Sequence, residues 1–446
     1  MSPINQSAPE KSVVERALSV FTDVRAGEGT SALLLAANAF YLLAFYQVLK
    51  IVREALILSE SGAVAASYAS AGMAAVLFFF VPAYSAFASR VNRVGLISGV
   101  TLFFASHLLI FWALGNAGLR IGVAFYIWIG VFNMVAVAQF WAFANDLYSS
   151  ERGKRLFPLV GVGATLGAAL GAGLATVVFG GIGPYRLMLI AAAGLLVPVL
   201  LTIVVHRREQ AHKAQESGVV EQPLLKSDGF RLVLKSRYLF MIAMMVLVFN
   251  QVNTLGGFML NSLITETAKN AAAAAGPGFD QRALIATLSG TVQTSVNILA
   301  FLLQAFVISR IFKYAGVRGA LFVLPTIAAF GYLAIAVVPI LAVVQWTKIF
   351  ENGTDYSIQN TTRHALFLPT SREEKYNAKQ AIDAFFVRTG DLLQAVVVFV
   401  GVQLALPIRG FALVNVVLVA IWLVLAVGIA REHRKMVGAE TAERAA

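Results

Sequence analysis

Long hydrophobic runs recur along the chain, and shorter polar stretches separate them. About 20 mainly apolar residues are enough for a helix to cross the hydrocarbon of a bilayer. The pattern therefore predicts an all-α membrane protein with twelve spanning helices. We place them at residues 31–58, 65–88, 94–115, 121–146, 157–180, 185–206, 238–262, 284–309, 317–337, 339–360, 380–405 and 410–430.

The longest polar stretch, residues 207–237, separates six of these runs from the other six. A weak internal repeat supports the division, because "YSSERGKRLF" and "PTSREEKYNA" align with an offset of 221 residues. Two six-helix bundles of this kind make up major facilitator transporters, whose substrate sites lie between the halves. We expect a cytoplasmic segment at 1–30, bundles at 31–206 and 238–430, a cytoplasmic linker at 207–237 and a cytoplasmic tail at 431–446.

Composition agrees with a membrane protein, since 59% of the residues are hydrophobic, 13% are charged and the mean hydropathy is +0.76. The net charge of +12 is explained by the membrane topology. Of the 35 Lys and Arg residues, 26 fall on the side of the N-terminus, 5 on the other side and 4 within predicted spans. Positive charge gathers on cytoplasmic loops, so we expect both termini in the cytoplasm and the protein in a bacterial inner membrane. This distribution gives no sign of a nucleic-acid partner.

Residues 1–30 are of mixed polarity, so the first hydrophobic run is expected to be an uncleaved span. The chain has no cysteine, which excludes disulfides and thiolate metal sites. We expect no metal and no cofactor. The small residues of "GVGATLGAALGAG" (161–173) lie within a span and favour close helix packing over a dinucleotide loop.

Charged side chains within the spans are the strongest functional signal. Lys50, Arg53 and Glu54 stand at spacings i, i+3 and i+4, so they share one helix face. Their position near the end of the run also permits the simpler interpretation that they reach the lipid headgroups. In 339–360 a polar stripe recurs every three or four residues, with Glu351 beside it; its members are Gln345, Lys348, Asn352, Asp355 and Gln359.

Further polar residues follow in 380–405 and in other spans, among them Lys379, Asp383, Arg388, Asp391, Asn145, Asp146, Asn250, Gln251, Asn253, Gln293 and Asn297. Unpaired polar groups are costly in hydrocarbon. So many of them, in both halves, predict a shared aqueous cavity. Lys and Arg facing such a cavity suit an anionic substrate, with the acids as counter-charges or proton carriers.

Three blocks resemble the non-mitochondrial ATP/ADP translocases, nucleotide exchangers of plastids and intracellular bacteria. "LKIVREALIL" (49–58) looks like the basic–basic–acid motif of their first helix. "QFWAFANDLYSSERGKRLFPLVGVGA" (139–164) is similar to their FWGFANE…EAKRFYALFGxGA block, with Asp146 replacing Glu. "DYSIQNTTRHALFLPTSREEKYNAKQAIDAFFVRTGD" (355–391) resembles a third block.

The resemblance implies ATP/ADP exchange by alternating access, with no enzymatic activity. We expect Lys50, Arg53, Lys348, Lys379, Arg388 and Asn145 to bind the substrate. We expect Glu54, Asp146, Glu351, Asp355, Asp383 and Asp391 to be counter-ions or gate residues. Two positions depart from the family pattern, since Asp391 stands where a Lys is usual and Gln251 where a Glu is usual. We expect a monomer.

Two alternatives remain open from the sequence. A proton-coupled facilitator of another organic anion, a peptide fragment or a drug would use Asp355 or Asp383 as the proton carrier. A membrane-embedded enzyme acting on lipid-linked substrates would need a catalytic pair, for which Asp146 and His364 are the only candidates.

Overall fold

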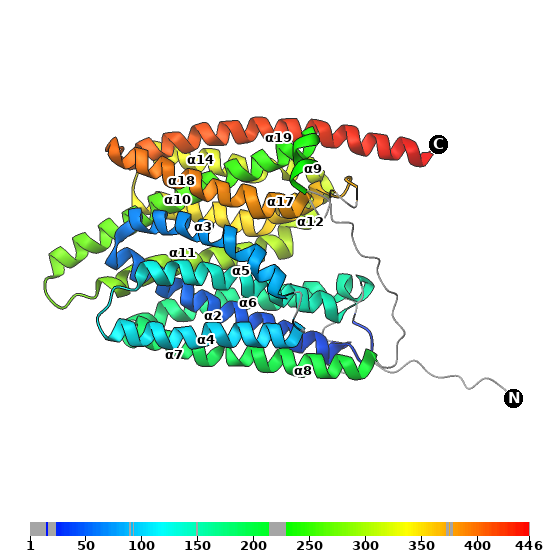
Figure 1. The fold of residues 1–446 in the computed structure, drawn as a ribbon. Coiled ribbons are helices and arrows are strands. Elements are labelled where there is room, and N and C mark those ends of the chain that lie inside the picture. The colour runs from blue at the N-terminus through cyan, green and yellow to red at the C-terminus, as the bar shows by residue number, and fades with distance from the viewer. Residues whose placement is uncertain are drawn as a thin grey trace.

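The computed structural model describes residues 15–16, 24–88, 91, 93–148, 150–213, 229–371, 374 and 378–445. Most of the expected N-terminal segment and residues 214–228 of the expected linker lie outside this part of the chain. The regular elements of the described residues are all helical. Figure 1 shows them side by side, with their axes running roughly along one direction.

The first group of helices contains α2 to α8. Its members are α2 (Gly29–Glu60), α3 (Gly62–Ala88), α4 (Arg93–Asn116), α5 (Gly122–Leu147), α6 (Ser150–Ile182), α7 (Pro184–Gly194) and α8 (Leu196–Lys213).

The second group contains α9 to α19. Its members are α9 (Gly229–Lys235), α10 (Arg237–Ala275), α11 (Gln281–Leu302), η1 (Leu303–Val307), α12 (Ile308–Tyr314), α13 (Gly316–Ala320), α14 (Val323–Val337), α15 (Leu341–Thr354), η2 (Asp355–Gln359), α16 (Asn360–Leu366), α17 (Lys379–Ala381), η4 (Ile382–Phe386), α18 (Val387–Gln403) and α19 (Ile408–Ala445). The elements η1, η2 and η4 are π-helical turns.

Ten helices of the described chain are long and apolar enough to cross a membrane. The expected spans 339–360 and 380–405 are not among them. They correspond to two continuous helical rods, α15–η2–α16 and α17–η4–α18, which carry charged residues and contain π turns. The sequence therefore placed helices correctly here.

Several helices extend beyond the hydrophobic runs that predicted them. Helix α10 continues to Ala275, where Gly276 ends it with a positive φ of 78°. The reason is the run 271–275 of five alanines, since alanine is the best helix former. At the other end of the chain, α19 runs through 431–445. Helix α8 occupies the start of the expected linker as far as Lys213.

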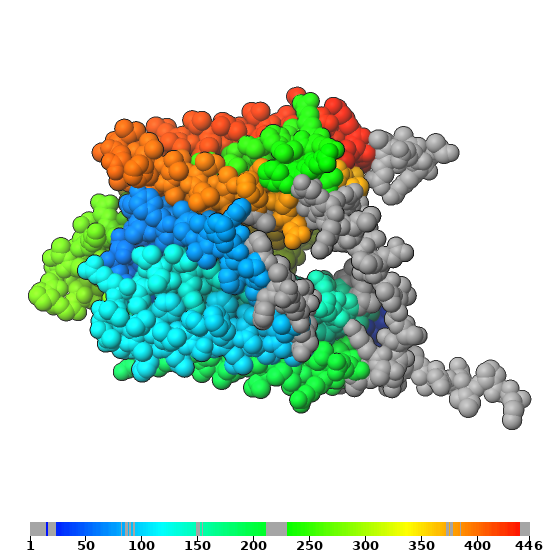
Figure 2. Space-filling model, in the orientation of Figure 1, coloured from blue at the N-terminus to red at the C-terminus, as the bar shows by residue number. Residues whose placement is uncertain are grey.

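Two hydrophobic clusters lie on either side of the middle of the molecule. One is drawn almost entirely from residues 24–205 and the other mainly from residues 233–429. Figure 2 shows the corresponding layers, with blue and cyan helices below and orange and red helices above. Residues 57–69, at the junction of α2 and α3, pack with the second cluster and so join the two groups.

The close contact of α2 with α6 explains the small residues of 161–173. A Cβ at Gly163, Gly167 or Gly171 would overlap a backbone carbonyl oxygen of α2, at Ala36, Phe40 and Ala44 respectively. These glycines recur at i and i+4, so they form one face of α6. The interpretation of this segment as a packing face is confirmed.

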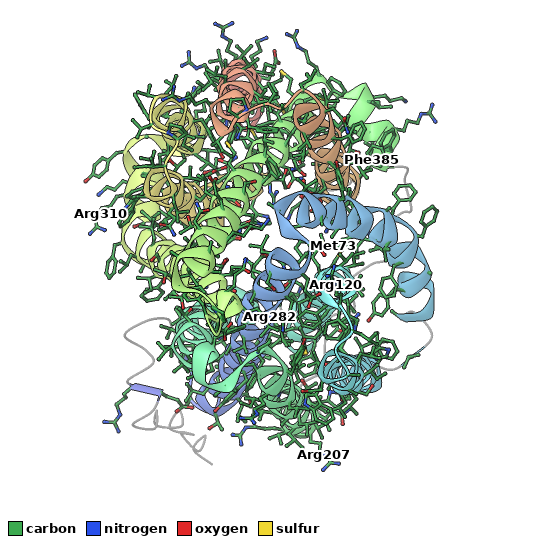
Figure 3. The ribbon with its side chains drawn as sticks, turned by 90° about the vertical axis from the view of Figure 1, so that its left-hand side faces the viewer. Met73, Arg120, Arg207, Arg282, Arg310 and Phe385 are labelled. Carbon is green, nitrogen blue, oxygen red and sulfur yellow. The ribbon has the colours of Figure 1, made fainter. Side chains whose placement is uncertain are left out.

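We call the end where α2 begins and α8 and α19 end the near end, and the opposite end the far end. In Figure 1 the near end is on the right. Figure 3 looks onto the far end, where Arg120 and Arg282 are labelled between the two groups of helices.

Candidate functional site

A cavity of about 250 Å³ lies between the two groups of helices. It draws residues from α2, α3, α5, α10, α11, α15 and α18. Its lining consists of Lys50, Ile51, Arg53, Glu54, Ala63, Ala66, Ser67, Ser70, Tyr126, Asn253, Thr254, Gly257, Phe258, Leu260, Asn261, Ser289, Val292, Gln293, Lys348, Asn352 and Gln394. Polar side chains from both groups therefore meet in one enclosed space, as the sequence predicted.

Helix α2 supplies the basic face of the first wall. The Lys50 ammonium donates a hydrogen bond to Gln293 Oε1 of α11 at 2.7 Å, which crosses between the groups. Arg53 is paired with the neighbouring carboxylate of Glu54. Its guanidinium lies 4.3 Å from the centre of the Tyr126 ring of α5, a cation–π geometry. These residues face the cavity and not the lipid headgroups.

The opposite wall holds a buried network around Lys348 of α15. The Lys348 ammonium, only 2% exposed, donates to Glu351 Oε2 at 2.9 Å and to Asn253 Oδ1 at 2.7 Å. The Tyr332 hydroxyl of α14 donates to the same Glu351 oxygen at 2.7 Å. A buried charge needs such partners because it has left water. Glu351 is fully buried and stands behind Lys348.

A direct hydrogen bond joins the two groups on the other side of the cavity. The Gln394 amide of α18 donates to Ser67 Oγ of α3 at 2.7 Å, and both residues are buried. Neither was singled out in the sequence. A serine and a glutamine in otherwise apolar segments give no signal that distinguishes a cavity wall from ordinary contacts between helices.

Arg388 and Asp391 form a third charged pair, at the contact between α18 and the first group. Arg388 Nη1 lies 3.2 Å from Asp391 Oδ2, and Asn250 of α10 donates to Asp391 Oδ1 at 2.8 Å. Arg388 Nη2 also lies 3.5 Å from Met134 Sδ of α5. The pair is therefore at the boundary of the two groups, although it is not part of the lining.

The polar stripe of the expected span 339–360 faces the cavity along only part of its length. Lys348 and Asn352 line the cavity, whereas Asp355 and Gln359 do not. Asp355 and Gln359 are themselves the first and last residues of a π turn, and Gln359 is buried against protein. The cavity therefore takes up only one stretch of the rod. The spacing of the polar residues does not reveal where that stretch ends.

The remaining candidates lie towards the near end. The Lys379 ammonium is 2.8 Å from His364 Nδ1, and Arg363 Nη1 is 3.8 Å from Asp383 Oδ1. None of these four residues lines the cavity. A role of Lys379 in substrate binding, or of Asp383 in gating, stays a prediction.

Asn145 and Asp146 end α5 and are exposed. Asp146 lines a separate hollow beside Tyr84, Met134 and Gln139. It does not share this hollow with His364, so the geometry gives no support to a catalytic pair. The part of the chain that the structure describes contains no cluster of three or more metal-ligating side chains.

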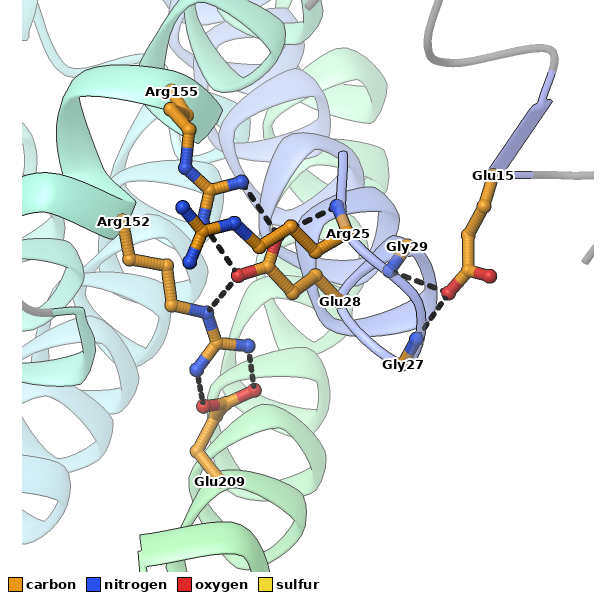
Figure 4. Close-up of polar contacts among 8 residues, drawn as sticks. All are labelled: Glu15, Arg25, Gly27, Glu28, Gly29, Arg152, Arg155 and Glu209. Atoms are coloured by element: carbon orange, nitrogen blue, oxygen red, sulfur yellow. Dashed lines mark hydrogen bonds and ion pairs between the residues drawn. The ribbon is translucent and has the colours of Figure 1, made fainter. Parts of the chain in front are cut away.

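A group of charged residues at the near end, Glu28, Arg152, Arg155 and Glu209, is here called the near-end cluster. Arg155 binds both oxygens of Glu28, at 2.9 and 2.8 Å. Arg152 binds both oxygens of Glu209, at 2.7 and 3.2 Å, and also lies 3.3 Å from Glu28. Figure 4 shows Arg152 between the two carboxylates. The cluster ties α6 to α8 and to the start of α2.

Burial opposes ionisation of Glu28, but its hydrogen bonds from Arg155 and from the Arg25 backbone lower the pKa of Glu28 below its usual 4.5. From the sequence, Arg152 and Arg155 taken singly indicate only that their loop lies on the cytoplasmic side of the membrane. The structure adds a packing role, which the sequence did not reveal because Glu28 and Glu209 lie far away along the chain.

The two groups are also joined by charge at the far end. Glu60, which ends α2, accepts a hydrogen bond from the Gly122 backbone at 2.7 Å. Its other oxygen lies 3.6 Å from Arg282 of α11. The guanidinium of Arg282 lies 6.0 Å from the centre of the Tyr185 ring.

Known proteins share both sequence and architecture with this chain. A sequence model described as the TLC ATP/ADP transporter matches residues 123–433. ADP,ATP carrier protein 1 of Chlamydia pneumoniae is 22% identical in an alignment 353 residues long that covers 68% of this chain and 65% of that protein. The chain therefore spans slightly less than two thirds of the length of this curated relative.

Solved transporter structures share the fold. The nucleoside transporter NupG has a TM-score of 0.60 at 15% identity, covering 90% of this chain and 98% of its own. A bacterial homologue of the human lysosomal transporter Spinster, inward-facing and unoccupied, has a TM-score of 0.61 at 14% identity, covering 91% and 98%. An inward-facing bacterial homologue of the iron transporter ferroportin has a TM-score of 0.61 at 12% identity, covering 90% and 98%.

At these identities the structural likeness concerns the fold alone, which is of the major facilitator type. The sequence match is more specific, because it extends from α5 to α19 and takes in more than half of the chain. It includes Lys348 of the cavity and the Arg388–Asp391 pair. This multi-pass membrane protein belongs to the TLC ATP/ADP transporter family.

Proposed function

We propose that the protein exchanges nucleotides across a bacterial inner membrane by alternating access, with ATP and ADP as the first pair to test. The observation that carries the proposal is the cavity between the two groups of helices, because it presents Lys50, Arg53 and Lys348 to one space. Lys and Arg are the side chains that bind phosphate oxygens in proteins. The family description and the name of the Chlamydia relative are the reason for proposing a nucleotide as the substrate.

The proposal includes twelve spans in two bundles, with α15–η2–α16 and α17–η4–α18 as the tenth and eleventh. Of their charged residues, Lys348, Glu351, Arg388 and Asp391 are paired and face protein or the cavity, which is where a bilayer tolerates charge. The proposed bundles cover residues 31–206 and 238–430, and the near end is assigned to the cytoplasm by the excess of Lys and Arg on that side.

Exchange also requires that the empty carrier does not reorient. A phosphate that binds Arg53 or Lys348 displaces Glu54 or Glu351 from its cation, and the pair re-forms when the substrate leaves. The hydrogen bonds Lys50–Gln293 and Gln394–Ser67 then join the two groups across the empty cavity and oppose reorientation.

The test is uptake into proteoliposomes. Vesicles preloaded with ADP should take up labelled ATP or ADP from outside, and vesicles preloaded with phosphate or an organic acid should not. A protonophore should leave this uptake unchanged. Uptake that ignores internal nucleotide and collapses with the protonophore would contradict exchange and favour a proton-coupled facilitator.

A second measurement links transport to the cavity. A Cβ at Gly257, which lines the cavity, meets nothing within 4 Å, and the chain has no native cysteine. Gly257→Cys therefore provides a single reporter inside the cavity. A membrane-impermeant maleimide should label it, and saturating ADP should slow the labelling. Labelling that ADP does not affect would place the nucleotide elsewhere.

A further inference from the structure

The cations around the cavity differ in whether an acid already neutralises them. Arg53 is paired with Glu54 on the same helix, and Lys348 with Glu351. Lys50 instead donates to the neutral amide oxygen of Gln293. Among the described residues that line the cavity or pair with its lining, three cations therefore face two acids. One positive charge is left over, and it lies at Lys50.

This balance sets a rising cost for each negative charge that a substrate brings. The first can be met by Lys50, which exchanges a neutral partner for an anionic one. Any further charge must compete with Glu54 for Arg53 or with Glu351 for Lys348. Each displaced carboxylate is left half-buried or buried without its cation, which is the expensive outcome for a charged pair. Glu351 is the harder to displace because Tyr332 also holds it, at 2.7 Å.

Among the described residues, the Arg388–Asp391 pair at the boundary between the groups adds no net positive charge. Arg388 is matched by Asp391, which also accepts a hydrogen bond from Asn250 at 2.8 Å. The size of the cavity, like its charge balance, favours a substrate with fewer phosphates. The cavity measures about 250 Å³, below the range of about 300–1,000 Å³ that is typical of small-molecule sites.

We propose that, within nucleotide exchange, this cavity selects by phosphate number and carries a nucleoside monophosphate better than the diphosphate, and the diphosphate better than the triphosphate. The selection is made by Glu54 and Glu351, which hold back two of the three cations. This inference rests on the proposed function, because it concerns the same cavity and the same substrate class.

The experiment compares labelled AMP, ADP and ATP as substrates of the wild-type protein in proteoliposomes. Each set of vesicles is preloaded with the unlabelled form of the nucleotide that it takes up. EDTA is present, so that Mg²⁺ does not mask phosphate charge. The initial rate divided by concentration, measured well below saturation, is expected to fall about tenfold with each added phosphate, which corresponds to about 1.4 kcal/mol per step.

Glu54→Gln tests the charge balance directly. Glutamine keeps the shape and can still accept from Arg53, but it releases that cation to the substrate. We expect the ratio of ADP uptake to AMP uptake to rise about fivefold, since removing one negative charge beside the substrate lowers its Coulomb repulsion of the added phosphate. A structural defect would lower both rates and leave the ratio unchanged. Glu432→Gln is the matched control, because Glu432 pairs with Lys435 on α19 far from the cavity; it should keep the wild-type ratio.

Each outcome decides something. A fall from AMP to ATP together with a raised ratio in Glu54→Gln supports the inference. Uptake of ADP or ATP as fast as that of AMP overturns it and leaves nucleotide exchange standing. An unchanged ratio in Glu54→Gln also overturns it, because the acids would then not set the preference. If none of the three nucleotides exchanges, the proposed function itself is contradicted.

Discussion

The near-end cluster and the cavity contain the same kinds of side chain, but they pair them differently. In the near-end cluster each ion pair joins two helices, since Arg155 reaches from α6 to Glu28 at the start of α2 and Arg152 reaches from α6 to Glu209 on α8. Around the cavity, Arg53, Lys348 and Arg388 each pair with an acid on their own helix.

The difference matters for a protein that moves. A bridge between helices of one group fixes those helices together, and it can stay intact while the group moves as a body. A pair within one helix neutralises a buried charge without placing an ion pair between the two groups of helices. The cavity charges can therefore be neutralised while the polar contacts that the described residues make across the cavity are hydrogen bonds alone, such as Lys50–Gln293 and Gln394–Ser67. Substitutions in the two regions should accordingly have different effects.

The largest expected effect is on transport. Arg53→Gln removes a cavity cation that no neighbour replaces, and exchange should fall at least about 100-fold, the equivalent of about 2.7 kcal/mol. The protein should still insert and should keep its melting temperature in detergent to within a few degrees. The lost ion pair lies within one helix and, among the described residues, only the cation–π contact with Tyr126 joined Arg53 to another helix. Full uptake by this variant would show that Arg53 does not bind the substrate. Arg388→Gln should behave in the same way.

The near-end cluster should show the opposite behaviour. Glu28→Gln leaves Arg155 and Arg152 without a shared anion, and losing hydrogen bonds to a charged group in this partly buried cluster costs about 2 kcal/mol. The melting temperature in detergent should fall by several degrees, while the KM for nucleotide should stay within about twofold of wild type. The control is again Glu432→Gln, whose exposed pair is worth about 0–1 kcal/mol. A raised KM with an unchanged melting temperature would contradict the assignment of the near-end cluster to stability and not to binding.

Acid should weaken the same cluster. The pKa of Glu28 is lowered from 4.5 in the folded protein. A lowered pKa means that the stabilisation is complete above pH 4.5 and is lost as the pH falls through the pKa of the folded state. Melting temperatures measured from pH 6 to pH 3 should therefore drop more steeply for wild type than for Glu28→Gln. Parallel curves would show that Glu28 contributes nothing to acid sensitivity.

The smallest effect is expected at the far end. Glu60→Gln weakens the contact with Arg282, which measures 3.6 Å and is partly exposed, while glutamine can still accept from the Gly122 backbone. Such pairs contribute less than about 1 kcal/mol, so transport should change less than about fivefold. Maleimide labelling of Gly257→Cys from the far end should rise, because one of the contacts that join the groups there is gone. Slower labelling would argue against a gating role.

The sequence predicted most of the architecture, because apolar run length and helix formation are local properties. It also identified Lys50, Arg53, Glu54 and Lys348, whose charge makes them conspicuous within spans. It could not identify Tyr126, Ser67 or Gln394 as parts of the cavity wall, since such residues are common in membrane helices. Nor could it foresee which acid each arginine binds when the partner is distant, as Glu209 is from Arg152.

The π turn at Asp355–Gln359 carries one extra residue within the rod α15–η2–α16. Deleting one residue there would rotate the part of the rod that follows, from Asn360 onward, by about 100° relative to Lys348 and Asn352, because an α-helix has 3.6 residues per turn. The near-end part of the rod would then present a different face to its neighbours, while the residues before the turn would keep their orientation.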